Sequence, residues 1–377
     1  MVDDDDWLFD SIALYQNLFM YDLQHGITDM DWTDGNNVCI ATSNGKKHEL
    51  AELHLPEKLL KTSQEEAGLI KNRDFHMNAG CYCPDQIACL RHVPNSRVVA
   101  TSPNTEICKI QFWKLNGSDE SDVIRNISTV ENNKSKGSPA HITPVTGTNN
   151  VVFGSHLDNL CIVDSITGQT TSKGLQRCER ISSMGLTDSN TLICCCQDTG
   201  ELVTFDLRED ISKVKHEHTN TISEGQKCFW TSSVTESGVY KLSSEGEVRK
   251  VEKHDWNNDV GRWYTELNPS SDFSYLKIHA LPGNEDDTVY ISGFDSNVYI
   301  FKLPLVSEVG GSTERVVSKP CFQHEGHLRN AGTCTDVDNK VLTTVTHLLH
   351  PRQQDIVLSA ATDGSLHAWQ INTCLDK

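Results

Sequence analysis

The chain has 377 residues, 37% of them hydrophobic, and a formal net charge of −19 at pH 7. It contains no stretch of eighteen apolar residues and starts with an acidic segment unlike a signal peptide, so we expect a cytoplasmic protein without a membrane span. The negative charge opposes direct binding to nucleic acid or to an anionic membrane, because both carry the same sign of charge.

The first predicted elements are a short helix and a strand. Four aspartates, Asp3–Asp6, open the chain, and acidic residues favour the first turn of a helix. Apolar residues follow at helical spacing, at Leu8, Ile12, Tyr15 and Phe19. We expect an acidic segment and helix over residues 1–17, packed on the side of the domain or offering Trp7 and Tyr15 to a partner. The composition of Leu18–Leu23 predicts a strand.

A strand–turn–strand pattern recurs along the rest of the chain. In its clearest copy an Asp-Gly turn at Asp363 precedes Trp369 by six residues, and Asp295 precedes Phe301 by the same step. Weaker copies bring the total to seven, which close at Leu53, Trp113, Val163, Phe205, Val251, Phe301 and Trp369. This pattern predicts an all-β, seven-bladed WD-repeat β-propeller over residues 18–377. An all-β sandwich is the alternative, but sandwiches lack the repeated Asp-to-aromatic step.

The end of the chain indicates how the ring closes. Only eight residues follow Trp369, too few for a turn and a full outer strand. We therefore expect the N-terminal strand at residues 18–23 to complete the last blade, just before Gly26–Trp32 starts the first. Such a closure removes two exposed sheet edges.

Four polar residues near the C-terminus predict a structural hydrogen-bond relay. In WD blades an aspartate orients a histidine, the histidine reaches a serine, and the serine accepts a hydrogen bond from an indole N–H. Here these residues are Asp363, His327, Ser359 and Trp369. A Ser-His-Asp triad contains the same types, but this serine would be enclosed between strands. The relay satisfies buried polar groups, and we expect no catalysis.

The remaining chemical patterns predict neither a metal nor a cofactor. The chain has 14 cysteines but no Cys-x-x-Cys, and Cys81-Tyr-Cys83 has no second pair nearby. Cys194–Cys196 falls in a predicted inner strand, where cysteine acts as a small buried hydrophobe. His324 and His327 are three residues apart rather than the four that a helical zinc-protease motif requires. Phosphate-binding glycine loops and nucleophile elbows are also absent from the sequence.

One stretch carries residue types that are enriched in binding hot spots. We expect His254–Asp272 to be a polar excursion from the blades, although such a loop can simply reflect tolerated length variation. Within it lie two tryptophans, an arginine and a tyrosine, at Trp256, Arg262, Trp263 and Tyr264. We predict that this cluster or the N-terminal helix face contributes to a partner interface.

Several short segments, in order along the chain, resemble the WD repeat-containing protein 73 family. They are Asp5–Leu8 with Ser11 and Leu14–Gln16, Ser121–Ile124, Ile291–Asp295, His324–His327, His350-Pro351 and Ser365–Trp369. The N-terminal block is specific, because general WD repeats have no counterpart for it. The middle of the chain, roughly residues 140–262, matches only in blade periodicity, and Gln370 stands where many blades carry aspartate.

The resemblance implies a non-catalytic adaptor that binds other proteins. The family is linked to the Integrator complex, where it is associated with the paired metallo-β-lactamase-type subunits that form the RNA endonuclease. The implied role is to support small nuclear RNA 3′-end processing. It is also placed at microtubules, spindle poles and the cleavage furrow, so a cytoskeletal adaptor that binds tubulin is the alternative. Tubulin is itself acidic, which favours the Integrator interpretation for a chain of this charge. We expect a cytoplasmic monomer before complex formation, with spindle-pole, cleavage-furrow and nuclear pools.

Overall fold

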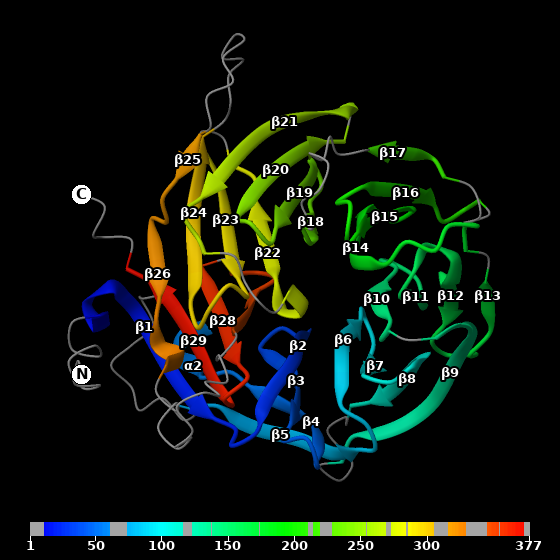
Figure 1. Cartoon of the computed structure of the whole chain (residues 1–377). Coiled ribbons are helices and arrows are strands. Elements are labelled where there is room, and N and C mark those ends of the chain that lie inside the picture. The colour runs from blue at the N-terminus through cyan, green and yellow to red at the C-terminus, as the bar shows by residue number, and fades with distance from the viewer. Residues whose placement is uncertain are drawn as a thin grey trace, which may run out of the picture.

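The computed structural model of the chain is a ring of β-sheets (Figure 1). Residues of the inner strands line a central channel. The structure describes residues 11–60, 74–115, 123–136, 138–172, 174–209, 214–218, 228–253, 255–268, 273–283, 286–304, 316–328, 345–353 and 355–372. These residues form seven sheets, so the prediction of a seven-bladed propeller is confirmed.

Each blade contributes one strand to the wall of the channel, followed by three strands farther out. The inner strands are β2 (Gly26–Asp34), β6 (Ile87–Val93), β10 (His141–Pro144), β14 (Ile181–Asp188), β18 (Trp230–Val234), β22 (Lys277–Leu281) and β27 (Val345–Leu349). The second strands are β3 (Asn37–Ser43), β7 (Val98–Pro103), β11 (Asn150–Gly154), β15 (Thr191–Cys196), β19 (Gly238–Ser243), β23 (Asp286–Ser292) and β28 (Ile356–Ala361). Because neighbours within a blade are antiparallel, all inner strands begin at one face of the ring and end at the other.

The third strands carry the seven residues at which the repeats were predicted to close. These strands are β4 (His48–His54), β8 (Ile107–Lys114), β12 (Cys161–Asp164), β16 (Leu202–Asp206), β20 (Glu247–Glu252), β24 (Val298–Pro304) and β29 (Ser365–Ile371). The outer strands are β5 (His76–Cys83), β9 (Arg125–Lys136), β13 (Thr170–Ser172), β17 (His216–His218), β21 (Asp255–Thr265), β26 (Phe322–His324) and β1 (Tyr15–Asp22). The sequence pattern therefore found the same strand in every blade.

The N-terminal strand closes the last blade, as the sequence predicted. β1 pairs antiparallel with β29, with Leu18 opposite Trp369, and the two strands lie side by side in Figure 1. The strand begins at Tyr15, three residues earlier than expected, so the helical interpretation of Tyr15 and Phe19 is wrong. An extended backbone there supplies hydrogen bonds to the open edge of β29, and that requirement overrides the apolar spacing. Residues 1–10 of the predicted segment lie outside the described part.

Besides the four strands of each blade, the described residues form one further strand and five short helical segments. A fifth strand, β25 (Val317–Ser318), pairs in parallel with the edge of β21. The helical segments are short: η1 (Ile12–Leu14), α2 (Glu57–Leu60), η2 (Leu157–Asn159), η3 (Phe273–Tyr275) and η4 (Gly326–Leu328). Among the described residues, no helix has the length and apolar character needed to cross a membrane.

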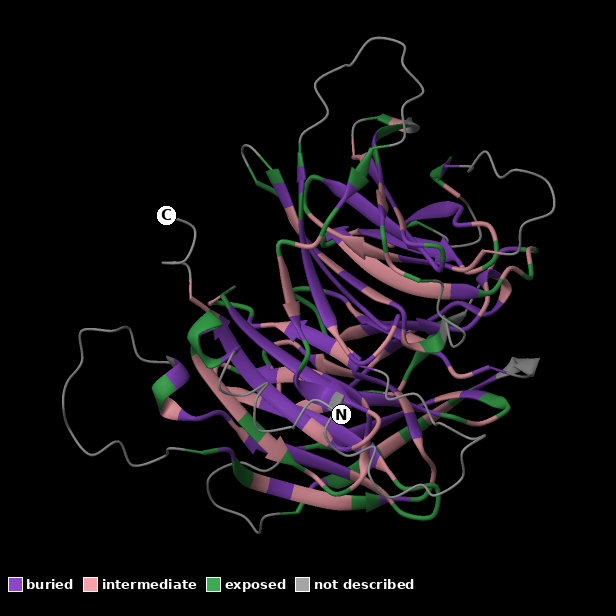
Figure 2. Cartoon of the chain, turned by 60° about the vertical axis from the view of Figure 1, so that its left-hand side comes forward, coloured by how far each residue is buried: buried purple, intermediate pink, exposed green. Residues whose placement is uncertain are grey.

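The hydrophobic core is divided into seven clusters, one between each pair of neighbouring blades. The cluster between the first and last blades, for example, joins Met30 and Ile40 to Leu358 and Leu366, all of them fully buried. Figure 2 shows these buried positions along the strands, with exposed positions gathered at turns and edges. Each blade is thus held by both neighbours, which fixes the positions of side chains around the channel.

Candidate functional site

The predicted relay residues lie together between β28, β29 and η4. The Trp369 indole N–H donates to Ser359 Oγ at 3.0 Å, and His327 Nε2 lies 2.8 Å from the same oxygen. All three side chains are fully buried. The expected direct contact between Asp363 and His327 is not formed: His327 Nδ1 lies 2.7 Å from Ser365 Oγ, which donates to Asp363 Oδ1 at 2.6 Å. Ser365 fills the position between them.

One assignment of protons satisfies every hydrogen bond of this relay. Ser359 donates to His327 Nε2, His327 Nδ1–H donates to Ser365, and Ser365 donates to the Asp363 carboxylate. Burial holds the pKa of His327 well below its ordinary value, which keeps the ring neutral as this arrangement requires. Because Ser359 is fully buried and its hydroxyl is committed to His327, a substrate has no access to that hydroxyl, and the geometry is that of a structural relay.

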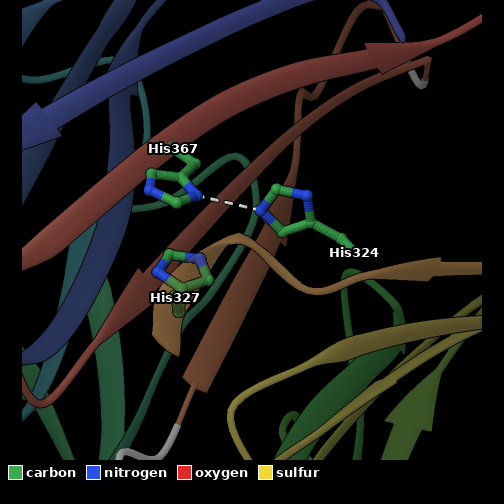
Figure 3. A group of neighbouring side chains, drawn as sticks. All are labelled: His324, His327 and His367. Atoms are coloured by element: carbon green, nitrogen blue, oxygen red, sulfur yellow. Dashed lines mark hydrogen bonds between the residues drawn. The ribbon is translucent and has the colours of Figure 1, made fainter. Parts of the chain in front are cut away.

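Two further histidines join His327 in a buried cluster that the sequence did not predict. His324 on β26 lies with its Nε2 3.0 Å from Nδ1 of His367 on β29, and the rings of His327 and His367 stack at 3.9 Å between centroids (Figure 3). The Tyr15 hydroxyl on β1 lies 2.7 Å from His324 Nδ1. Burial is the main cause that lowers the pKa of His324 far below its ordinary value. The cluster thus joins the N-terminal strand to the last two blades.

The three histidines bring ligand atoms within 4.8 Å of one another, a spacing that raises the question of a metal ion. Each neutral imidazole has one nitrogen with a free lone pair. In His324 and His327 both ring nitrogens already have hydrogen-bond partners. Ligand rings also point a nitrogen edge at a shared ion, whereas His327 and His367 face each other at an interplanar angle of 12°. The arrangement therefore fits a hydrogen-bonded cluster and does not fit a metal centre.

The predicted partner cluster lies on β21, an outer strand, and not on a loop. A strand turns alternate side chains to opposite sides. Trp263 is only 1% exposed and belongs to the core beside the sixth blade, whereas Arg262 and Tyr264 lie on the other face of the strand, Arg262 exposed and Tyr264 half-buried. Trp263 is therefore removed from the candidate interface. The guanidinium of Arg262, whose side chain is 50% exposed, lies 5.2 Å from the Tyr264 ring centre and pairs with Glu247. Trp256 is half-buried near His216.

The two N-terminal candidates have different outcomes. Trp7 lies outside the described residues. Tyr15 is only 7% exposed and is committed to His324, so it cannot offer its ring to a partner. One signal for this burial was present in the sequence: the apolar residues between Tyr15 and Tyr21 also fit a strand, and the closing strand of a ring must turn one face inward.

Buried ion pairs also link neighbouring blades. Lys250 Nζ on β20 lies 2.8 Å from Asp287 Oδ2 on β23, and the carboxylate is 1% exposed. Arg97, in the second blade, forms two hydrogen bonds with Glu52 on β4. Such pairs fix neighbouring blades because removal of one partner leaves a buried charge.

Comparison with known proteins identifies the family to which the chain belongs. No protein-family model matches the chain. The Integrator complex assembly factor WDR73 of Mus musculus is 31% identical over 379 residues, which cover 97% of this chain and 97% of that protein. The proteins of the same name from Homo sapiens and Danio rerio are 30% and 27% identical, again over 97% of this chain. The similarity thus includes all seven blades and the closing strand, and the chain belongs to the WDR73 family.

Proposed function

We propose that this chain is a non-enzymatic scaffold that assists assembly of the Integrator complex. The observation that carries the proposal is its similarity, across nearly the whole length of both proteins, to relatives named as Integrator complex assembly factors. The geometry agrees with a scaffold, because Ser359 and His327 are fully buried and belong to a structural hydrogen-bond relay. A propeller with fixed blades offers rims and outer strands to protein partners.

The finer part of the proposal concerns the partner. The chain would bind the paired metallo-β-lactamase-type subunits in the cytoplasm and stabilise them before they reach the nucleus, in support of small nuclear RNA 3′-end processing. A formal charge of −19 favours a protein partner over RNA. Exposed Arg262 and half-buried Tyr264 and Trp256, all on β21, remain candidates for part of this interface.

Reconstitution from purified components tests the proposal. The full-length chain is mixed with the purified endonuclease pair and, separately, with tubulin, at physiological salt. A stable complex with the endonuclease pair, isolated by size exclusion, is the expected result. Binding to tubulin without binding to the endonuclease pair would instead establish the cytoskeletal alternative, with its spindle-pole and cleavage-furrow locations.

A second experiment tests the assembly role in cells. Depletion of the chain should reduce the amount of the assembled endonuclease pair and raise the level of unprocessed small nuclear RNA, and re-expression should restore both. Imaging of the tagged protein should show a mainly cytoplasmic pool. Unchanged levels of the pair and of unprocessed RNA after depletion would refute the assembly role.

A further inference from the structure

A cavity of about 520 Å³ opens at the end of the channel where the inner strands begin. Its wall comes from several blades that are distant in sequence, and includes Gln86, Asn104, His141, Arg180 and Gln197. We call this cavity the channel mouth. None of the described residues that line it is acidic, although the chain as a whole carries a net charge of −19. The mouth is therefore electrostatically different from the average surface of the protein.

Arg180 is the cation of the channel mouth, and its guanidinium pairs with none of the described carboxylates. It differs in this from six other arginines that form ion pairs: Arg91, Arg97, Arg177, Arg208, Arg249 and Arg262. Its backbone is fixed, since its carbonyl accepts from the Gln197 N–H at 2.8 Å and it forms a bridge with His156. The exposed guanidinium is thus held at the mouth by the fold while its own hydrogen-bond donors remain available.

The positive charge of Arg180 acts on two neighbouring histidines, His141 and His156. Burial and the charges of Arg91 and Arg180 lower the pKa of His141 to about 4. Burial also lowers the pKa of His156, and Arg180 contributes in the same direction. Both rings are therefore neutral near pH 7 and do not compete with Arg180 for an anion.

Three side-chain amides surround the mouth without internal partners. Gln86 lies just before β6 at the start of the second blade, Asn104 lies in the turn between β7 and β8, and Gln197 lies in the corresponding turn between β15 and β16 of the fourth blade. Their side chains form no hydrogen bond with a described residue, so each offers two N–H donors and one carbonyl acceptor. This combination matches the backbone of an extended peptide, which needs both donors and acceptors.

We propose that the channel mouth binds an extended segment of the partner protein and pairs one of its carboxylates with Arg180. The inference rests on the proposed function in taking that partner to be the Integrator endonuclease pair. A carboxylate matches the planar fork of a guanidinium in a bidentate contact. An RNA segment fits less well, because the phosphates of a polyanion require several cations and the described lining offers one arginine. Deeper in the channel, Arg91 is already paired with Asp29 at 2.8 Å.

Substitution of Arg180 tests this contact against a matched control on the opposite face. Arg352 is also exposed and forms no ion pair with a described residue, but it lies in the turn between β27 and β28, where the inner strands end. Affinity for the purified endonuclease pair is measured for the wild-type chain and for the Arg180→Ala, Arg180→Lys, Arg180→Glu and Arg352→Ala variants. Thermal unfolding confirms that each variant is folded, as expected for side chains without internal partners.

The expected result is a graded loss of affinity for the Arg180 variants and no such loss for the Arg352 variant on the opposite face. Arg180→Ala should raise the Kd about tenfold or more, as for an interfacial arginine that anchors a partner, and Arg180→Glu should raise it further. Arg180→Lys should fall between wild type and alanine, because it keeps the charge and loses the fork. Arg352→Ala should stay within about twofold of wild type. Equal affinities of wild type and Arg180→Glu would overturn the inference and leave the proposed function intact.

A peptide selection separates failure of the site from failure of the proposed function. A displayed library of random peptides is selected on the wild-type chain and on Arg180→Glu. Peptides that contain Asp or Glu should be enriched on the wild type relative to the variant, and amide replacements of those residues should abolish the binding. Such enrichment without binding of the endonuclease pair would retain the site and reject the proposed partner. Identical selections on both proteins would reject the site.

Discussion

Acidification should destabilise the fold, because several histidines are buried in their neutral form. Burial, together with the neighbouring His367, holds the pKa of His324 well below its ordinary value of 6.5. When the chain unfolds, this imidazole returns to water and binds a proton as the pH falls through about 6.5. The unfolded state therefore binds more protons at acidic pH. The contribution of His324 to stability is complete above that pH and is lost progressively below it.

The size of the effect follows from the two protonation equilibria. For one histidine that stays neutral when folded, a change from about pH 7 to about pH 5.5 lowers the free energy of unfolding by about 1.3 kcal/mol. A total stability of about 5–15 kcal/mol is usual for a domain, so even one such residue gives a measurable loss. His327 and His347 are also fully buried with pKa values far below the ordinary one, and should add losses in the same direction.

Urea unfolding at the two pH values, followed by tryptophan fluorescence, measures the loss. His324→Gln removes the titrating group but keeps an amide that can hydrogen-bond to Tyr15, so this variant should lose about 1.3 kcal/mol less than wild type between the two pH values. Tyr15→Phe is the matched control, since it removes the same hydrogen bond and keeps the imidazole; its loss should equal that of wild type. The reasoning is refuted if His324→Gln loses as much stability as wild type.

Three further predictions concern the forces that hold the ring together. Ser359→Ala should lower the free energy of unfolding by about 2–4 kcal/mol in the same urea assay, because it leaves both an indole N–H and an imidazole nitrogen without their hydrogen-bond partner. Thr101→Val removes the acceptor of only one indole, in the second blade, and should lower the free energy of unfolding by about 1–3 kcal/mol. Lys250→Met leaves a buried carboxylate unpaired and should cost about 3–5 kcal/mol by chemical denaturation, whereas Lys253→Met, from an exposed pair, should cost less than about 1 kcal/mol. Deletion of residues 1–22 exposes the edge of β29 and should produce aggregates in light scattering; a monomeric, fully folded product would contradict the role of β1 in closure.

The blades were predictable from sequence because the signal is local. A turn residue six positions before an aromatic marks the third strand of a blade, and the step from Asp363 to Trp369 recurs from Asp295 to Phe301. The closing strand was predictable for a different reason: residues 18–23 have the composition of a strand and come just before Gly26, where the first blade begins. Both arguments depend on residue types and their positions along the chain, which a sequence gives directly.

The side chains of the candidate site were predicted less well, for two physical reasons. On β21 the error lay in the secondary structure: as a loop, Trp263 and Arg262 would both be exposed, but on a strand consecutive residues face opposite sides. The histidine cluster was not predicted because it depends on tertiary contacts. His324, His367 and Tyr15 come from three strands, and their meeting depends on how the first strand completes the last blade.

The same closure connects the stability of the ring to the channel mouth. Gln86, Asn104, Arg180 and Gln197 belong to different blades or turns, and only the packing of neighbouring blades keeps them around one cavity. A variant that weakens closure without opening the ring, such as Tyr15→Phe, should therefore unfold at lower urea but bind the endonuclease pair with unchanged affinity. Arg180→Glu should do the opposite, losing affinity at unchanged stability. If the two variants instead lost affinity and stability in parallel, the contact at Arg180 would be an indirect effect of folding, and the channel mouth would not be a binding site.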